Sequence, residues 1–167
     1  MKKLIYAYIA GLFDGEGTIT LTTNFSSKKF RYPAVSVANT DLSLLKFIKK
    51  EFGGAICSKK KQKKHHSQSY HWQARYDRAI YFLKKIYPFL KIKEKCQRAS
   101  LIINCYKKVT RRNGRYTFDE FKNKTAFEEK FFSIKSLHPP KFKPKNSFDY
   151  YGGDGGELNP PSASIST

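Results

Sequence analysis

Two carboxylates, Asp14 and Glu16, stand where an apolar helical stretch runs into a strand pattern, and they alternate with Gly15 and Gly17. We expect the helix to run from about Lys3 to Phe13. Acidic side chains are disfavoured at the C-terminal end of a helix, where the macrodipole places partial negative charge. Carboxylates beside carbonyl groups freed at a glycine are therefore costly until a cation binds, and hard divalent ions such as Mg²⁺ take such oxygen ligands. The simplest alternative is a capped core helix that carries surface acids.

The helix that would position these acids has two distinct faces. Ile5, Ile9 and Leu12 recur at helical spacing and can cover a sheet. A second stripe consists of small residues and ends in an acid: Ala7, Ala10, Gly11 and Asp14. Small residues permit close helix approach, and the chain offers no second helix like this one, so we expect the partner helix to come from another copy in a two-fold homodimer. The alternative is a stripe packed beneath a loop of the same subunit.

The rest of the pattern predicts two αββ units and further helices, in the order αββαββα. The expected elements after the first helix are strands over Thr18–Asn24 and Phe30–Ala38, a helix capped by Asp41 and closed by Gly53 and Gly54, strands over Ala55–Lys60 and Ser69–Tyr76, a helix that stops at Pro88, one that follows Lys93, and one over Phe118–Ile134. No βαβ crossover is needed, so we expect an α+β fold whose antiparallel sheet is covered by helices on one face and open on the other.

The composition predicts one domain and a short extension. We place the domain over residues 1–135, followed over 136–167 by a basic, proline-containing arm and a tail rich in Gly, Pro and Ser. The formal net charge is +20, and residues 146–167 carry −3, which leaves +23 on the remainder. So much positive charge on one body indicates a polyanionic partner, although charge alone does not distinguish DNA from RNA.

The cysteines and histidines argue against a disulfide framework or a zinc site. Three cysteines at unpaired spacing are typical of reduced thiols in an intracellular protein, and the four histidines lack partners at ligand spacing. No stretch reaches transmembrane length, so we expect no membrane partner. Whether the compartment is an archaeal or bacterial cytoplasm or an organelle is left open.

The open sheet face is where a basic protein of this kind would contact nucleic acid. Strand alternation directs a set of polar side chains away from the core: Thr20, Thr22, Asn24, Ser36, His71, Gln73 and Arg75. Two-stranded ribbons fit the DNA major groove, and such side chains reach base edges. The hairpin turns add basic residues suited to phosphates: Lys28, Lys29, Lys59 and Lys61. The alternative is a half-solvated sheet with solvated loops.

Three stretches resemble the LAGLIDADG homing endonuclease family. Residues 9–17 (IAGLFDGEG) match its nine-position signature, with Glu16 where Asp is commoner. The stretch YPFLKIKEK resembles the family's Pro-Phe-Leu element and aligns Lys93 with its active-site lysine. VANTD aligns Asn39 with a polar residue that helps to hold the attacking water, where the family often has Gln, and Ser43 stands where some members carry a basic residue. The resemblance covers roughly residues 4–109 and is of the single-motif, homodimeric type.

The resemblance implies a site-specific double-strand DNA endonuclease whose sheet forms a DNA-binding saddle. Glu16 and the Gly15 carbonyl would hold Mg²⁺ or Mn²⁺, with Ca²⁺ binding without supporting cleavage, while Lys93 and Asn39 complete the catalytic set. Family members cut long pseudo-palindromic sites, leave short 3′ overhangs and are encoded within introns or similar mobile elements. The alternative from another class is an intron RNA-binding maturase on the same scaffold, and a weaker one is a metal-free DNA-binding regulator.

Overall fold

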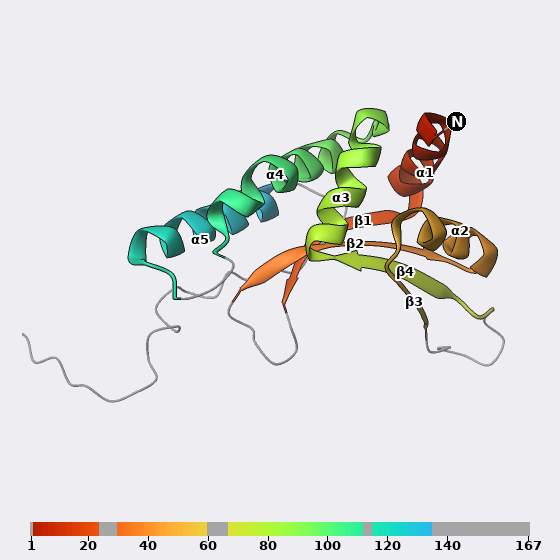
Figure 1. Cartoon of the computed structure of the whole chain (residues 1–167), viewed down its shortest axis with the longest axis horizontal. Helices are drawn as coiled ribbons and strands as arrows, with labels where there is room; N and C mark the ends of the chain where they lie inside the picture. The colour runs from red at the N-terminus through yellow and green to blue at the C-terminus, as the bar shows by residue number, and fades with distance from the viewer. Residues whose placement is uncertain (1, 24–29, 60–66, 112–114, 135–167) are drawn as a thin grey trace, which may run out of the picture.

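One antiparallel sheet organises the computed structural model, which describes residues 2–23, 30–59, 67–111 and 115–134. Its four strands lie in the order β1-β2-β4-β3 (Figure 1). Their bounds are Gly17–Thr23 (β1), Arg31–Asn39 (β2), Ala55–Ser58 (β3) and Tyr70–Arg75 (β4). Each αββ unit therefore contributes one hairpin, and the second strands of the two hairpins, β2 and β4, pair at the centre of the sheet.

The helices lie on one side of this sheet. Their bounds are Lys2–Glu16 (α1), Leu42–Phe52 (α2), Tyr76–Ile86 (α3), the 3₁₀ turn Tyr87–Phe89 (η1), Lys93–Val109 (α4) and Phe118–Ser133 (α5). Figure 1 shows the opposite side of the sheet free of every helix that the structure describes. The predicted α+β fold, with the order αββαββα and an extra C-terminal helix, is confirmed.

Strand alternation separates a core face from an open face, as predicted. Ile19, Val35, Val37, Trp72 and Ala74 are all buried beneath the helices. The indole of Trp72 packs against the Phe82 ring of α3, with centroids 4.9 Å apart, and its Nε1 donates a hydrogen bond of 2.7 Å to the Gly53 carbonyl. Trp72 therefore buries a large apolar surface and also has a partner for its one polar atom.

The second helix begins and ends where the sequence predicted. The Asp41 carboxylate accepts hydrogen bonds from the backbone N–H groups of Ser43 and Leu44, which caps α2. Hydrogen bonds from Ser43 lower the pKa of this carboxyl group. Gly53 ends the helix at φ 69°, a conformation that favours glycine.

Two element boundaries differ from expectation. The first helix does not end at Phe13 but continues through Glu16, so Asp14 and Gly15 are helical and β1 begins at once. Tyr76, expected at the end of a strand, instead starts α3 with φ 53°. Its ring stacks on Tyr32 of β2 with centroids 4.0 Å apart, a tertiary contact that accompanies the sharp turn.

Several predictions concern residues outside the described part of the chain. These are Asn24, Lys28 and Lys29 in the first hairpin, Lys61 in the second, and residues 136–167. The proposed boundary between residues 135 and 136 stays a prediction. None of the described helices is long and apolar enough to cross a membrane.

The α1–β1 junction leaves no room for a side chain at Gly17. A Cβ atom there would overlap the Phe13 ring and lie 2.5 Å from the Phe13 carbonyl oxygen, whereas a Cβ at Gly15 would meet nothing within 4 Å. We therefore expect Gly17→Ala to lower the free energy of unfolding by about 1–3 kcal/mol. Gly15→Ala, the matched control, should leave it unchanged or slightly raised, because alanine favours helix. Urea denaturation measures both, and an equal effect of the two substitutions would contradict this account of the junction.

Candidate functional site

The C-terminal end of α1 is held by a lysine of α4. Helix ends leave their last carbonyl groups without helical partners. Lys95 Nζ donates hydrogen bonds to two of them, 2.7 Å to the Phe13 oxygen and 2.5 Å to the Asp14 oxygen. Burial lowers the pKa of Lys95, while the negative charges of Asp14, Glu94 and Glu16 act to raise it. Glu16 thus lies close enough to act electrostatically on the ammonium group that binds its own helix end.

The same helix end binds the start of α4 through Asp14. Its carboxylate accepts hydrogen bonds from the backbone N–H groups of Lys91, at 2.7 Å, and Ile92, at 3.4 Å. Lys93, the first residue of α4, follows directly and is exposed. Residues 77 positions apart are therefore joined, so Glu16 and Lys93 lie on directly connected elements.

Asn39 lies at the same end of the sheet. Gly17 pairs with Val37 in antiparallel register, so the end of β2 runs alongside the end of α1. Asn39 Oδ1 accepts a 2.8 Å hydrogen bond from the Asp41 backbone N–H, which makes it part of the turn into α2. The side-chain amide nitrogen of Asn39 is the group that this contact does not use.

Glu16 and the Gly15 carbonyl are the candidate metal ligands among the described residues. Within the residues described, no three His, Cys, Asp or Glu side chains cluster closely enough to hold an ion. Glu16 is exposed at the end of α1, and the neighbouring Gly15 carbonyl is not among the groups that bind Lys95. These oxygen donors are of the kind that a hard divalent cation takes.

The register aligns the predicted contact residues in rows across the open face. Thr20 pairs with Ala34, which pairs with Arg75, and Ser36 pairs with Gln73. His71 lies opposite Ala38 in the next row of the same face, and Thr22 continues the β1 side. The described members of the predicted set therefore share one surface, which also includes Cys57 of β3. Lys59 directly follows β3, where its N–H bonds the Ser69 carbonyl at 2.8 Å.

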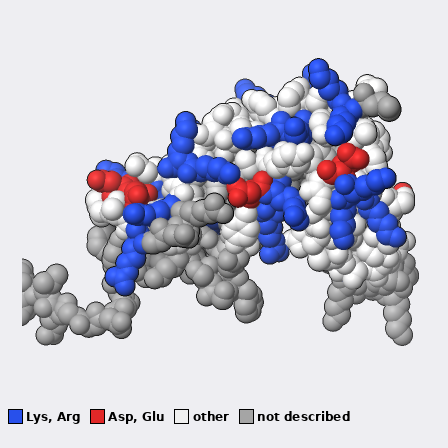
Figure 2. Space-filling view, viewed as in Figure 1, with Lys and Arg blue, Asp and Glu red and all other residues white. Residues whose placement is uncertain are grey.

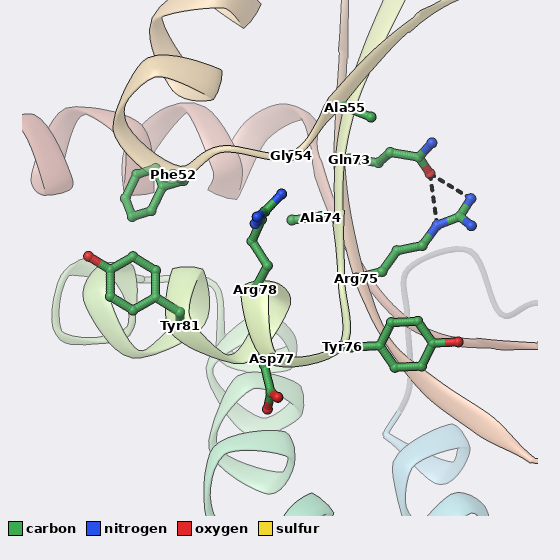
Figure 3. Close-up of a pocket in the computed structure, with 10 residues that line it drawn as sticks. All are labelled: Phe52, Gly54, Ala55, Gln73, Ala74, Arg75, Tyr76, Asp77, Arg78 and Tyr81. Carbon is green, nitrogen blue, oxygen red and sulfur yellow. Dashed lines mark hydrogen bonds between the residues drawn. The ribbon is translucent and has the colours of Figure 1, made fainter.

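Several side chains on this face are already bonded to one another. Arg75 Nη2 donates a 2.9 Å hydrogen bond to Gln73 Oε1, and both side chains point to the side of β4 opposite Ala74 (Figure 3). Gln73 Nε2 in turn contacts Cys57 Sγ at 3.7 Å. Burial, helped by the positive charges of Lys59 and Arg75, lowers the pKa of His71. The row thus presents preformed hydrogen-bonding groups beside a neutral imidazole.

Positive charge extends well beyond this face. Figure 2 shows Lys and Arg side chains over much of the helical side, with acidic side chains in small groups between them. The chain as a whole holds 33 Lys and Arg against 13 Asp and Glu. This imbalance raises the local concentration of any polyanion, whichever face binds it.

The predicted small-residue stripe of α1 needs one correction. Ala10 is fully buried within its own subunit and cannot take part in a dimer contact, because the helix turns this residue into the core. The Asp14 carboxylate also has partners within the subunit. Gly11 is exposed with open space around it, and Ala7 is half-buried. Leu4 and Tyr8, which are 74% and 58% exposed, extend this face in a way that the stripe of small residues had not indicated.

Comparison with known proteins places the chain in a family. Residues 9–109, which make up more than half of the chain, match the LAGLIDADG endonuclease family. The chain belongs to this family. Its matched region contains both αββ units and α4, so the junction and the open face both lie inside it. No curated protein matches the chain.

Solved structures of LAGLIDADG proteins share the fold at low sequence identity. The homing endonuclease I-CvuI, in complex with its target in the presence of calcium, is 16% identical with a TM-score of 0.58, covering 82% of this chain and 85% of that one. The archaeal intron-encoded homing endonuclease I-Vdi141I, complexed with DNA, is 16% identical with a TM-score of 0.56, covering 86% and 91%. I-GzeII in complex with its DNA target has 16% identity and a TM-score of 0.54, covering 97% of this chain but 54% of that one.

Lys95 is the residue of the junction that the sequence analysis missed. The alternating lysines of KIKEK could have indicated that Lys93 and Lys95 have different partners, because side chains two residues apart on a helix point in different directions. Once α4 begins at Lys93, Lys95 cannot share its orientation. It points instead to α1 and also lies over the Phe13 ring, 5.8 Å from the centroid.

The two lysines should therefore differ in their effect on stability. We expect Lys95→Met to lower the free energy of unfolding by about 1–3 kcal/mol, because two carbonyl groups lose their donor. The matched substitution Lys93→Met removes an exposed side chain and should change it by less than about 0.5 kcal/mol. Chemical denaturation of both variants checks this, and equal values would show that the Lys95 contacts contribute nothing.

Proposed function

We propose that the protein is a site-specific homing endonuclease that hydrolyses both strands of a long, pseudo-palindromic DNA site as a homodimer and leaves short 3′ overhangs. The observation that carries the proposal is the α1–α4 junction, which holds an exposed carboxylate, Glu16, and an exposed lysine, Lys93, on bonded elements beside the open face. An RNA-binding maturase needs neither group. Family membership and the shared fold support the same assignment.

The catalytic roles follow from the chemistry of each group. Glu16 and the Gly15 carbonyl would hold Mg²⁺ or Mn²⁺, and a divalent ion there supplies Lewis acidity and a more acidic bound water. The Lys93 ammonium stabilises negative charge that develops on the phosphate oxygens during hydrolysis. The free amide nitrogen of Asn39 donates to and orients water. Ca²⁺ is expected to bind without supporting cleavage, and I-CvuI was crystallised with its target and calcium.

The DNA is proposed to lie along the open face. A strand and a DNA duplex both advance about 3.4 Å per unit, so the nine residues of β2 can follow roughly nine base pairs. Thr20, Ser36, Gln73 and Arg75 present hydroxyl, amide and guanidinium groups suited to base edges. Lys59, at the end of β3, would contact phosphate and add affinity without sequence information.

A homodimer would complete the active sites. Duplex DNA offers two scissile phosphates on opposite strands, whereas the chain carries one LAGLIDADG motif. The exposed α1 face, with Leu4, Tyr8 and Gly11, supplies a surface for a two-fold contact.

The proposed nuclease activity depends on the charge of Glu16. We expect Glu16→Gln to abolish Mg²⁺-dependent cleavage of the uninterrupted host locus while leaving binding to that DNA nearly intact, because the change keeps size but removes the charge that holds the ion. Glu129→Gln, an exposed acid on α5, is the matched control and should cut normally. Cleavage by Glu16→Gln would refute the assigned mechanism. Specific binding to intron RNA without DNA cleavage by the wild-type protein would instead support the maturase alternative.

The dimer depends on close approach of two α1 helices. Gly11 is exposed and a Cβ there would meet nothing within 4 Å, so Gly11→Leu should leave the thermal midpoint unchanged or higher, since leucine favours helix more than glycine. The same bulk should separate the paired helices, and we expect the loss of both dimer and cleavage. Sedimentation of the DNA complex measures this. A monomeric wild-type protein that still cuts both strands would exclude the proposed assembly.

A further inference from the structure

Helix α5 lies outside the region that matches the LAGLIDADG family, yet it contacts the β1–β2 hairpin at the end next to the turn. Its target is Arg31, the first residue of β2. The Arg31 backbone N–H donates to Glu128 Oε1 at 3.3 Å, and its carbonyl accepts from Lys124 Nζ at 3.2 Å. The Arg31 side chain pairs with Glu128 at 3.5 Å and lies over the Phe132 ring, 5.0 Å from its centroid. Both the backbone and the side chain of one strand residue are therefore held by one helix.

The contacts with α5 lie on the side of β2 that faces β4, at a point that β4 does not reach. β2 pairs with β1 from Arg31 onward, but with β4 only from Ala34 onward. In an antiparallel sheet, the N–H and C=O of one residue point toward the same neighbouring strand. Since both groups of Arg31 bind α5, they face the side on which β4 has already ended. Pro33 faces the same side and has no N–H to leave unpaired, which suits an edge.

β4 ends early because the chain turns away at Tyr76. This residue adopts φ 53° and begins α3, and its ring stacks on Tyr32 of β2. The backbone groups of Arg31 accordingly bind α5 at a point that lies beyond the last residue pair between β2 and β4. Figure 1 shows the start of β2 extending toward α5 past the end of β4.

The two α5 residues are held in a costly environment. Lys124 is 2% exposed, and its ammonium group donates to Thr110 Oγ1 at 2.9 Å and lies 4.3 Å from the centroid of the Tyr106 ring. Burial lowers the pKa of Lys124 to about 8 and raises the pKa of Glu128, 3.9 Å away. A buried ion pair adds little net stability compared with apolar side chains of the same size. Both members of the pair also contact Arg31, Lys124 at the carbonyl oxygen and Glu128 at the N–H and the side chain.

We propose that Lys124 and Glu128 are positioning residues that fix the start of β2, where the β1–β2 hairpin approaches its turn. They would thereby determine which DNA bases the two strands read. The inference rests on the proposed function, because it assigns DNA to the open face. Thr23 pairs with Arg31 and Thr22 with Tyr32, so a displacement of Arg31 passes directly to the β1 contact residues. Gln73 pairs with Ser36, five residues further along β2, and should be affected much less.

The test compares base preferences at two sets of positions within one DNA site. The full-length wild-type protein first selects its site from a randomised duplex library. Thr20→Val and Thr22→Val then identify the base pairs that β1 reads, and Gln73→Leu identifies those that β4 reads. We expect Glu128→Gln and Lys124→Met to relax preference at the β1 positions by about fivefold or more, the lower end of the value of one base contact. Preference at the β4 positions should stay unchanged.

Matched controls lie on the same helix. Glu129→Gln and Lys122→Met change exposed side chains and should leave both sets of positions unaltered. An equal loss of base preference at both sets of positions would show a merely structural role and overturn the inference. Unchanged base preference at the β1 positions would also overturn it, as would a DNA site in which no base pair depends on Thr20 or Thr22. Glu128→Gln retains an acceptor for the Arg31 amide, so it decides the question if Lys124→Met does not fold. A wild-type protein that selects no sequence marks failure of the proposed function itself.

Discussion

The reciprocal hydrogen bonding between the ends of α1 and α4 is the interaction on which the candidate site depends. The Asp14 carboxylate accepts from the backbone just before α4, and the Lys95 ammonium donates to the last carbonyl groups of α1. Each helix end presents unpaired groups of opposite polarity, so the two ends satisfy each other. An acid on the last turn of a helix is thereby tolerated, and Glu16 stays exposed within the field of nearby positive charge.

The sheet places a second surface beside this junction. Its buried side chains Ile19, Val35, Val37, Trp72 and Ala74 face the helices, and polar side chains such as Gln73 and Arg75 lie on the opposite face. Because strand order sets β2 and β4 side by side, contact residues from both hairpins align in rows. The junction and the open face thus belong to one connected unit, which suits the proposed enzyme because it would have to hold a long substrate in one register.

The helix beyond the family-matched region extends the same principle. A sheet with strands of unequal length has unpaired backbone groups where one strand extends beyond the end of its neighbour. Here β2 extends beyond the end of β4, and side chains of α5 bind the backbone N–H and carbonyl groups of Arg31. A helix beyond the family-matched region therefore binds the start of β2, at the opposite end of that strand from the junction.

Spacing along the chain was enough to determine the elements and the two faces of the sheet. Alternation placed Trp72 and Ala74 in the core, and Asp41 and Gly53 marked the ends of α2, because these signals act between residues close in sequence. Sequence likewise indicated Glu16, Lys93 and the open-face residues as candidates, whose roles remain proposals. Only the tertiary structure decided that Ala10 faces the core, that Lys95 binds α1, and that α5 binds β2. The last two outcomes depend on partners 81 to 97 positions apart, which packing brings together and no local pattern specifies.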